Sequence, residues 1–194
     1  LVYNWQKEIK RFAPELQTVI VTGNVPERAG LIKKSRAGEI LIMSYDLLKR
    51  DADIYKNIVF SVQVIDEAQY IKNPSTQAAK GVKKITAAFK LALTGTPIEN
   101  RLSELWSIFD YLMPGFLYPY QRFREEIEIP IVAEQDENKM ERLQRMIRPF
   151  ILRRLKGDVL KDLPEKLEEN IFARLEGEQM QLYDAHVAQM KQML

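Results

Sequence analysis

One segment restricts the fold of this chain more than any other: an apolar-rich, β-branched run that stops at two adjacent carboxylates. The run is Val59–Ile65, and Asp66 and Glu67 follow it directly. Runs of this kind are typical of strands buried in a parallel sheet. Ligands of open α/β sheets collect at the carboxyl ends of such strands. The segment therefore predicts an α/β fold with a reaction site at the end of this strand.

A second apolar run ends in a polar turn. It is Leu91–Leu93, followed by Thr94, Gly95, Thr96 and Pro97. Because parallel strands end at the same edge of a sheet, we expect both runs to deliver polar side chains to one place. Such an edge suits a site that handles phosphates.

The two carboxylates are of the type that nucleotide hydrolysis requires. A triphosphatase needs one carboxylate to hold Mg²⁺, usually through water, and a second polar group to orient the attacking water. Asp66 suits the first role and Glu67 the second. Taken alone, the pair is better explained as an acidic strand-to-loop turn. Together with the second motif, it favours a nucleotide site.

Several segments resemble one family of enzymes. DEAQ, IKNPSTQAAK and LALTGTPIENRLSELWSIFDYLMPGFL are similar to the second and third helicase motifs of the Swi/Snf family of DNA-dependent ATPases, in helicase superfamily two. NWQKEIKRFAP, ILIMSYDLL and RPFILRRLKGDVLKDLPEK resemble further family segments in the same order. The resemblance covers nearly the whole chain. It implies an ATP- and Mg²⁺-dependent translocase on double-stranded DNA, built from two RecA-like lobes.

The resemblance also implies roles for residues next to the catalytic pair. Gln69, Thr94, Gly95 and Thr96 would couple the nucleotide site to movement of the lobes. Without the family, Gln69 would only decorate a loop, and the threonines would serve turn chemistry around Gly95 and Pro97.

Residues that contact DNA are implied in the same way. Ser44 and Tyr45 resemble a motif that touches the DNA backbone. Without the family, this segment would be an ordinary helix cap, with Ser44 or Asp46 as the capping residue. Arg153 and Arg154 lie in the best basic cluster, which from charge alone is a solvated edge beside a core segment. Trp106, like Trp5 near the start of the chain, lies on an apolar helix face. We interpret both tryptophans as core residues rather than base-stacking platforms.

The sequence departs from the family in one respect. None of its eight glycines belongs to a GxxxxGK[ST] phosphate loop. In the family this loop precedes the NWQKEI-like segment, and the arginine finger lies in the second lobe. We therefore expect a fragment of an ATPase that is inactive by itself.

The pattern of apolar residues predicts the domain organisation. We expect a partial RecA-like lobe over 1–113, a helical protrusion over 114–162, and a connector with the first helix leading to the second lobe over 163–194. We expect strands at Thr18–Val21, Ile40–Met43, Val59–Ile65 and Lys90–Leu93, and helices at Ser75–Ile85 and Leu102–Met113.

Composition removes some classes of site. The chain has no Cys and one His, which excludes disulfides and thiolate zinc sites and makes a histidine metal site implausible. The net charge of +2 is only mildly basic. We expect an intracellular protein, in cytoplasm, nucleoid or nucleus, with no membrane association. Its partners would be double-stranded DNA and a DNA-bound protein as cargo.

Three functional classes remain open at this point. The first is a piece of a DNA translocase or remodeller. The second is a catalytically dead relative that acts as a scaffold for DNA or protein. The third is an unrelated metal-dependent α/β hydrolase that uses the two carboxylates without a nucleotide. Against this class, the sequence shows no additional His, Asp or Glu cluster near them, which a two-metal site would need.

Overall fold

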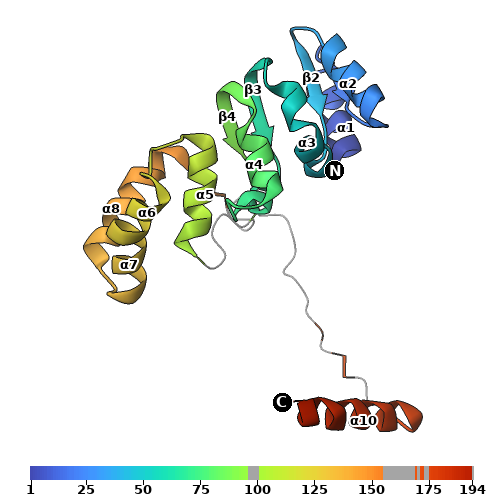
Figure 1. Cartoon of the computed structure of the whole chain (residues 1–194), viewed down its shortest axis with the longest axis vertical. Coiled ribbons are helices and arrows are strands. Elements are labelled where there is room, and N and C mark those ends of the chain that lie inside the picture. Colours follow the sequence, from blue (N-terminus) through green and yellow to red (C-terminus); the bar gives the residue numbers. More distant parts are fainter. Residues whose placement is uncertain (96–100, 155–168, 170, 173–174, 194) are drawn as a thin grey trace. The chain divides into compact units, whose positions relative to one another are not determined.

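The structure is a computed structural model that describes residues 1–95, 101–154, 169, 171–172 and 175–193. The chain divides into two compact units, Leu1–Pro149 and Phe150–Leu194, each considered by itself (Figure 1). Thr96, one of the predicted coupling residues, lies outside the described residues.

Helices and strands alternate in the first part of the larger unit. The elements are α1 (Val2–Phe12), β1 (Gln17–Ile20), α2 (Val25–Lys34), β2 (Glu39–Ile42), α3 (Tyr45–Asp51), β3 (Val59–Ile65), α4 (Gln77–Lys83) and β4 (Thr86–Ala92). Short 3-10 helices follow α3 and β3, at Ala52–Tyr55 and Ala68–Ile71. β1 pairs with β2 and β3 with β4, and both pairs are parallel. Parallel neighbours require a crossover, which α2 and α4 supply, so the predicted α/β class with parallel strands is confirmed.

The predicted bounds of two elements were wrong by two or more residues. β4 begins at Thr86 rather than Lys90, because its first residues pair with β3, where Val59 lies opposite Thr86. α4 is shorter than the helix predicted over Ser75–Ile85, and its capping residue is Thr76. The Thr76 hydroxyl accepts a hydrogen bond from the Ala79 amide at 3.2 Å, whereas the Ser75 hydroxyl donates to the Asn73 side chain.

A glycine allows α3 and α4 to pack closely. A Cβ added to Gly81, which is buried in α4, would lie 3.3 Å from the Cα of Lys49 in α3. Any larger residue would have to push the two helices apart. This contact fixes the helix that connects β3 to β4 against the helix that precedes β3.

The rest of the larger unit is helical. It contains α5 (Leu102–Leu112), α6 (Tyr120–Phe123), a π-helical turn (Arg124–Glu128), α7 (Ile129–Ala133) and α8 (Glu137–Ile147). A 3-10 turn (Arg148–Phe150) begins in the larger unit and ends at the first residue of the smaller one. The smaller unit contains α10 (Glu178–Met193). In the part of the chain that the structure describes, no helix combines the length and the apolar character needed to cross a membrane.

α5 belongs to both hydrophobic cores of the larger unit. Ile108 and Tyr111 pack in the core beneath the strands, while Leu105, Trp106 and Phe109 pack in the core of the following helices. The residues that α5 buries lie on more than one side of the helix, because it packs into both cores. The buried Ser107 hydroxyl satisfies its hydrogen-bonding requirement by donating to the Ile71 carbonyl at 2.6 Å. α5 therefore joins the strand-containing part of the unit to its helical part.

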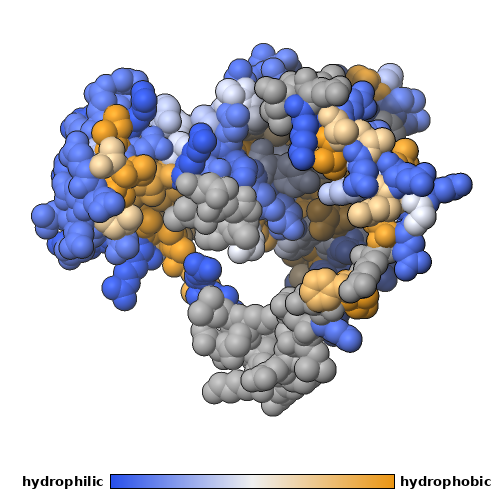
Figure 2. All heavy atoms as spheres, turned by 90° about the horizontal axis from the view of Figure 1, so that it is seen from below, coloured by the Kyte–Doolittle hydropathy of each residue, from blue (hydrophilic) through white to orange (hydrophobic). Residues whose placement is uncertain are grey.

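One face of the β3–β4 pair is not covered by the described residues. Val62 and Val64 of β3 lie opposite Phe89 and Leu91 of β4, and all four side chains are exposed. The space-filling view shows apolar surface exposed between hydrophilic regions (Figure 2). The opposite face carries Ile65, which is buried in the core.

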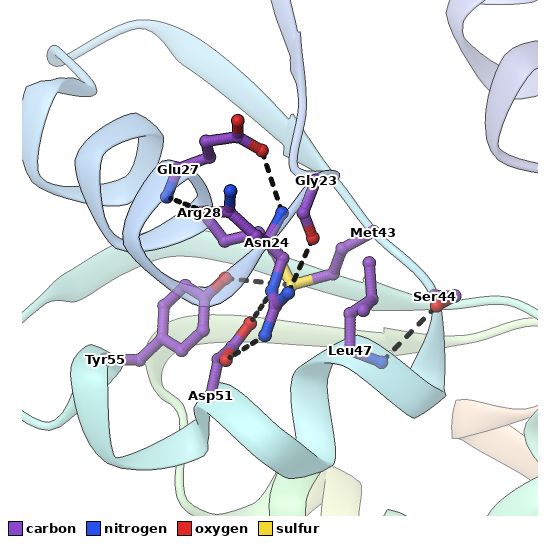
Figure 3. Close-up of polar contacts among 9 residues, drawn as sticks. All are labelled: Gly23, Asn24, Glu27, Arg28, Met43, Ser44, Leu47, Asp51 and Tyr55. Carbon is purple, nitrogen blue, oxygen red and sulfur yellow. Dashed lines mark hydrogen bonds and ion pairs between the residues drawn. The ribbon is translucent and has the colours of Figure 1, made fainter.

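A buried ion pair connects α2 to the end of α3. The Arg28 guanidinium donates to both carboxylate oxygens of Asp51, at 2.5 and 2.8 Å, and to the Gly23 carbonyl at 2.7 Å (Figure 3). The two side chains are only 4% and 3% exposed. The same helix, α2, begins with a capping box in which Asn24 and Glu27 satisfy each other's amides. Since the two charges satisfy each other away from water, loss of either one leaves the other uncompensated.

We predict that Asp51→Ala strongly destabilises the larger unit. Removing one partner of a buried pair leaves an unpaired charge inside the protein, and we expect the melting temperature to fall by about 10 °C. Thermal unfolding followed by circular dichroism measures this. Asp53→Ala is the matched control, because Asp53 pairs with Lys56 and Lys84 at an exposed site. Equal melting temperatures for the two variants would contradict the prediction.

Candidate functional site

The backbone turns sharply at the carboxyl end of β3. The strand ends at Ile65, and Glu67 adopts φ 51° and ψ 55°, in the left-handed region. Residues other than glycine seldom adopt this conformation, and such residues concentrate at functional sites. The turn removes the strict alternation of the strand, which would direct neighbouring side chains to opposite faces. The two adjacent carboxylates can therefore act on one site.

Asp66 is held through both its side chain and its backbone. One carboxylate oxygen, Oδ2, accepts a hydrogen bond from the indole N–H of Trp5 at 2.8 Å. The other, Oδ1, accepts one from the Glu67 amide at 2.9 Å. The Asp66 carbonyl accepts the hydroxyl of Tyr45 at 2.8 Å. Two contacts from distant parts of the chain and one from the next residue thus fix Asp66.

Hydrogen bonds connect Glu67 to the end of β4. The Gln69 side-chain amide donates to the Glu67 carboxylate at 2.7 Å, and the Thr94 hydroxyl donates to the Gln69 oxygen at 2.8 Å. The backbones are joined as well, because the Ala68 amide donates to the Leu93 carbonyl at 2.8 Å. The expectation that the two strands bring polar side chains to one edge is confirmed.

The predicted DNA-contacting residues after β2 have other contacts in the structure. Ser44 caps α3, and its hydroxyl accepts the Leu47 amide at 3.4 Å (Figure 3). Tyr45 is half-buried, and its ring lies 5.4 Å from that of Tyr70. The helix-cap interpretation of Ser44 therefore describes its contacts, while Tyr45 belongs to the surroundings of Asp66. A role of either residue in DNA binding stays a prediction.

The remaining predicted residues lie at exposed positions. Gly95 is exposed and directly follows Thr94. Arg153 and Arg154 are both exposed and lie in the smaller unit. Their side chains therefore have the access to solvent that contact with DNA phosphates requires.

Trp5 is the residue that inspection of the sequence missed. We interpreted it as a core residue, and it is instead half-buried with its N–H on the Asp66 carboxylate. Nothing local to residues 4–14 signals this contact, because its two partners are 61 positions apart. Trp106 does follow the interpretation, since it is 8% exposed within the helical core.

The surroundings of Tyr45 raise the pKa of its hydroxyl well above the ordinary value. Burial is the main cause, and the negative charges of Asp66 and Glu67 add to it. The hydroxyl therefore stays protonated, and it remains a donor to Asp66 throughout the neutral range. Burial also raises the pKa of Tyr55 and of Tyr111.

The carboxylate of Asp66 is chemically suited to Mg²⁺. Each of its oxygens accepts one N–H and has a further lone pair for a cation or its water shell. Among the described residues there is no group of three or more His, Cys, Asp and Glu side chains that could hold a metal ion. By its chemistry, Asp66 can supply one oxygen ligand to such an ion or one acceptor to its water shell.

Comparisons with known proteins agree with the fold. The family model of the SNF2-related domain matches residues 1–194. An ATP-dependent helicase of Mycoplasma genitalium is 42% identical over 184 residues, which cover 95% of this chain and 17% of the relative. Human TATA-binding protein-associated factor 172 is 37% identical over 197 residues, covering 95% of this chain and 11% of the relative.

A solved structure is similar over most of the chain. The SWI2/SNF2 ATPase core of Sulfolobus solfataricus in complex with double-stranded DNA matches with a TM-score of 0.71 and 37% identity. The match covers 98% of this chain and 40% of that one. The present chain therefore corresponds to a minor part of each of these proteins.

We predict that Tyr45→Phe reduces the loss of stability at alkaline pH. Phenols of the unfolded chain ionise near about pH 10. The folded pKa of Tyr45 lies above that value, so its contribution is complete below about pH 10 and is lost as the pH rises further. Urea unfolding at several alkaline pH values measures the decline. Tyr3→Phe, which alters an exposed ring, should decline like the unmodified protein. The same decline in all three proteins would contradict the assignment.

Proposed function

This chain belongs to the SNF2-related family, and on that premise we propose that it supplies part of the ATPase core of a translocase on double-stranded DNA. The helicase relative and the DNA-bound ATPase core support ATP as the nucleotide and duplex DNA as the partner. Membership of the family also removes the third class, an unrelated metal-dependent hydrolase.

The observation that carries the proposal is the network of side chains at the ends of β3 and β4. Asp66 and Glu67 lie next to each other at a turn, and Gln69 and Thr94 connect Glu67 to the second strand. Phosphoryl transfer depends almost entirely on positioning and on charge stabilisation. A network in which each polar side chain is held by another meets that requirement.

We assign separate roles to the two carboxylates. Asp66 would hold Mg²⁺, which when bound neutralises charge on the phosphate oxygens. Glu67 would orient the attacking water and accept its proton. Gln69 donates to Glu67 through a neutral amide, so it orients this carboxylate without cancelling its charge.

The same network offers a route from the nucleotide to the rest of the protein. A change at Glu67 would alter its hydrogen bond with Gln69, and through Gln69 the position of Thr94. Gly95 and Thr96 follow Thr94 and lead on towards α5, the helix shared by both cores. We propose that these residues couple hydrolysis to movement.

The DNA-binding residues are proposed from the family resemblance and from exposure. Arg153 and Arg154 would neutralise phosphates of the duplex, with Ser44 and Tyr45 as further contacts. The name of one relative refers to association with TATA-binding protein, which supports a DNA-bound protein as cargo. Such a protein would work in the compartment that contains the DNA.

We retain the proposed division of the chain. Residues 1–113 would be the partial RecA-like lobe, 114–162 the helical protrusion, and 163–194 the connector and first helix towards the second lobe. α5 supports a firm connection between the first two parts, because it contributes to both cores.

We predict that Glu67→Gln in the intact protein lowers ATP hydrolysis by about two to four orders of magnitude. The amide cannot accept a proton, but it preserves the shape of the side chain, so nucleotide affinity should change little. Asp66→Asn should weaken Mg²⁺-dependent nucleotide binding as well. Steady-state hydrolysis and nucleotide titrations, both with duplex DNA present, separate the two effects.

The controls for this experiment also address the scaffold alternative. The present chain by itself lacks the phosphate loop and should remain at background in the same assay. Near-normal turnover by Glu67→Gln would refute the role of Glu67. An intact, unmodified protein that binds duplex DNA without any hydrolysis would favour the catalytically dead scaffold.

We predict that Arg153→Gln weakens DNA binding in a salt-dependent manner. Each phosphate contact releases about one counterion, so the slope of log affinity against log salt should decrease by about one unit. Arg154→Gln should act similarly. Arg145→Gln is a suitable control, because this exposed arginine already pairs with Glu141 at 3.1 Å. Unchanged slopes for Arg153→Gln and Arg154→Gln would argue against both contacts.

A further inference from the structure

We propose that Trp5 is a positioning residue of the nucleotide site, which orients the Asp66 carboxylate towards Mg²⁺. The proposal rests on the function inferred above. Its basis is the hydrogen bond from the Trp5 indole N–H to Oδ2 of Asp66, 2.8 Å long, between the first helix and the end of β3.

The bond from Trp5 completes the restraint on the carboxylate. The Glu67 amide binds Oδ1, but it is adjacent in the chain and holds only one side of the group. Rotation of a terminal carboxylate about its last bond is soft, since this torsion has broad minima. A second donor on the other oxygen, from a distant element, restricts that rotation. With the Tyr45 hydroxyl on the Asp66 carbonyl, backbone and side chain are both fixed.

Trp5 is itself held in place by its own helix. α1 packs against β1, and the Gln6 side chain of α1 donates to the hydroxyl of Thr18 in β1 at 3.3 Å. The Trp5 ring is half-buried, so it is supported by packing and its N–H points to the site. A bulky ring on a supported helix can therefore place a donor with little freedom.

The chemistry of indole suits this role. Its N–H donates a hydrogen bond. The ring carries no charge and does not accept a hydrogen bond. A lysine or arginine at this position would neutralise Asp66 and compete with a cation. A neutral donor orients the carboxylate and leaves its negative charge available for Mg²⁺. Groups of this kind that orient a metal ligand typically contribute about 10- to 100-fold in metal affinity or activity.

The test compares two tryptophans that each donate one hydrogen bond. In the intact protein, Trp5→Phe retains an aromatic ring and removes the N–H on Asp66. Trp106→Phe removes an N–H that binds the Tyr118 carbonyl at 3.0 Å in the helical core. Binding of a fluorescent ADP analogue is titrated with Mg²⁺, and thermal unfolding is recorded for each variant.

We expect Trp5→Phe to raise the Mg²⁺ concentration at half-saturation about tenfold or more, with a melting temperature close to that of the unmodified protein. The change should appear in kcat and in Mg²⁺ dependence rather than in the KM for ATP at saturating Mg²⁺. Trp106→Phe should show the reverse, with reduced stability and unchanged Mg²⁺ dependence. If Trp5→Phe binds Mg²⁺ and nucleotide like the unmodified protein, the proposal is wrong.

Asp66→Asn separates failure of this proposal from failure of the proposed function. If Asp66→Asn leaves Mg²⁺ dependence unchanged, the function assigned to the site is wrong. If Asp66→Asn abolishes it and Trp5→Phe has no effect, only the role of Trp5 is wrong. In the Asp66→Asn background, Trp5→Phe should cause no further change in Mg²⁺ dependence, because it acts through that carboxylate.

A second replacement covers the case in which Trp5→Phe does not fold. Benzothienylalanine at position 5 has sulfur in place of the ring N–H and nearly the same shape as tryptophan. The protein that carries this residue should fold like the unmodified protein and still bind Mg²⁺ less tightly. Normal Mg²⁺ affinity with this residue would show that the shape of the ring, rather than its N–H, is what the site needs.

Discussion

The site depends on the parallel pairing of β3 with β4. This pairing places the carboxyl ends of both strands at one edge, where the Leu93 amide donates to the Ile65 carbonyl at 2.8 Å. The Ala68 amide in turn donates a hydrogen bond to the Leu93 carbonyl, also at 2.8 Å. Glu67 adopts its left-handed conformation between these two anchored points. Without the ladder, neither that turn nor the contact from Gln69 to Thr94 would be held.

α5 transfers the order of this edge to the helical part of the larger unit. Its Ser107 hydroxyl binds the Ile71 carbonyl, only a few residues after the carboxylates, and Tyr111 donates to the Gln63 carbonyl of β3 at 3.3 Å. On its other side, Leu105 and Phe109 pack among the following helices. Buried, close-packed helices transmit displacements instead of absorbing them. A shift at the end of β3 would therefore reach the helical part through α5.

The sequence predicted those parts of the molecule that local patterns encode. The bounds of β3 follow from its β-branched residues, and the edge containing Asp66 and Thr94 follows from where the apolar runs stop. The start of β4 was missed, because Ala87 and Ala88 have low strand propensity, and Thr86–Phe89 is a strand through its pairing with β3. Local sequence also does not encode contacts between distant elements. The sequence therefore showed no sign of the contacts of Trp5 and Tyr45 with Asp66, or of that of Arg28 with Asp51.

Two carboxylates of this chain illustrate how a fold separates structural from chemical roles. Asp51 is buried and takes its hydrogen bonds from a guanidinium, so its charge is cancelled where it stands. Asp66 is half-buried, and the donors to its carboxylate in the part of the chain that the structure describes are an indole and a backbone amide, both neutral. Neutral donors orient a carboxylate while its charge remains available to attract a cation. This pattern of donors, more than burial alone, supports the proposal that Asp66 binds a cation.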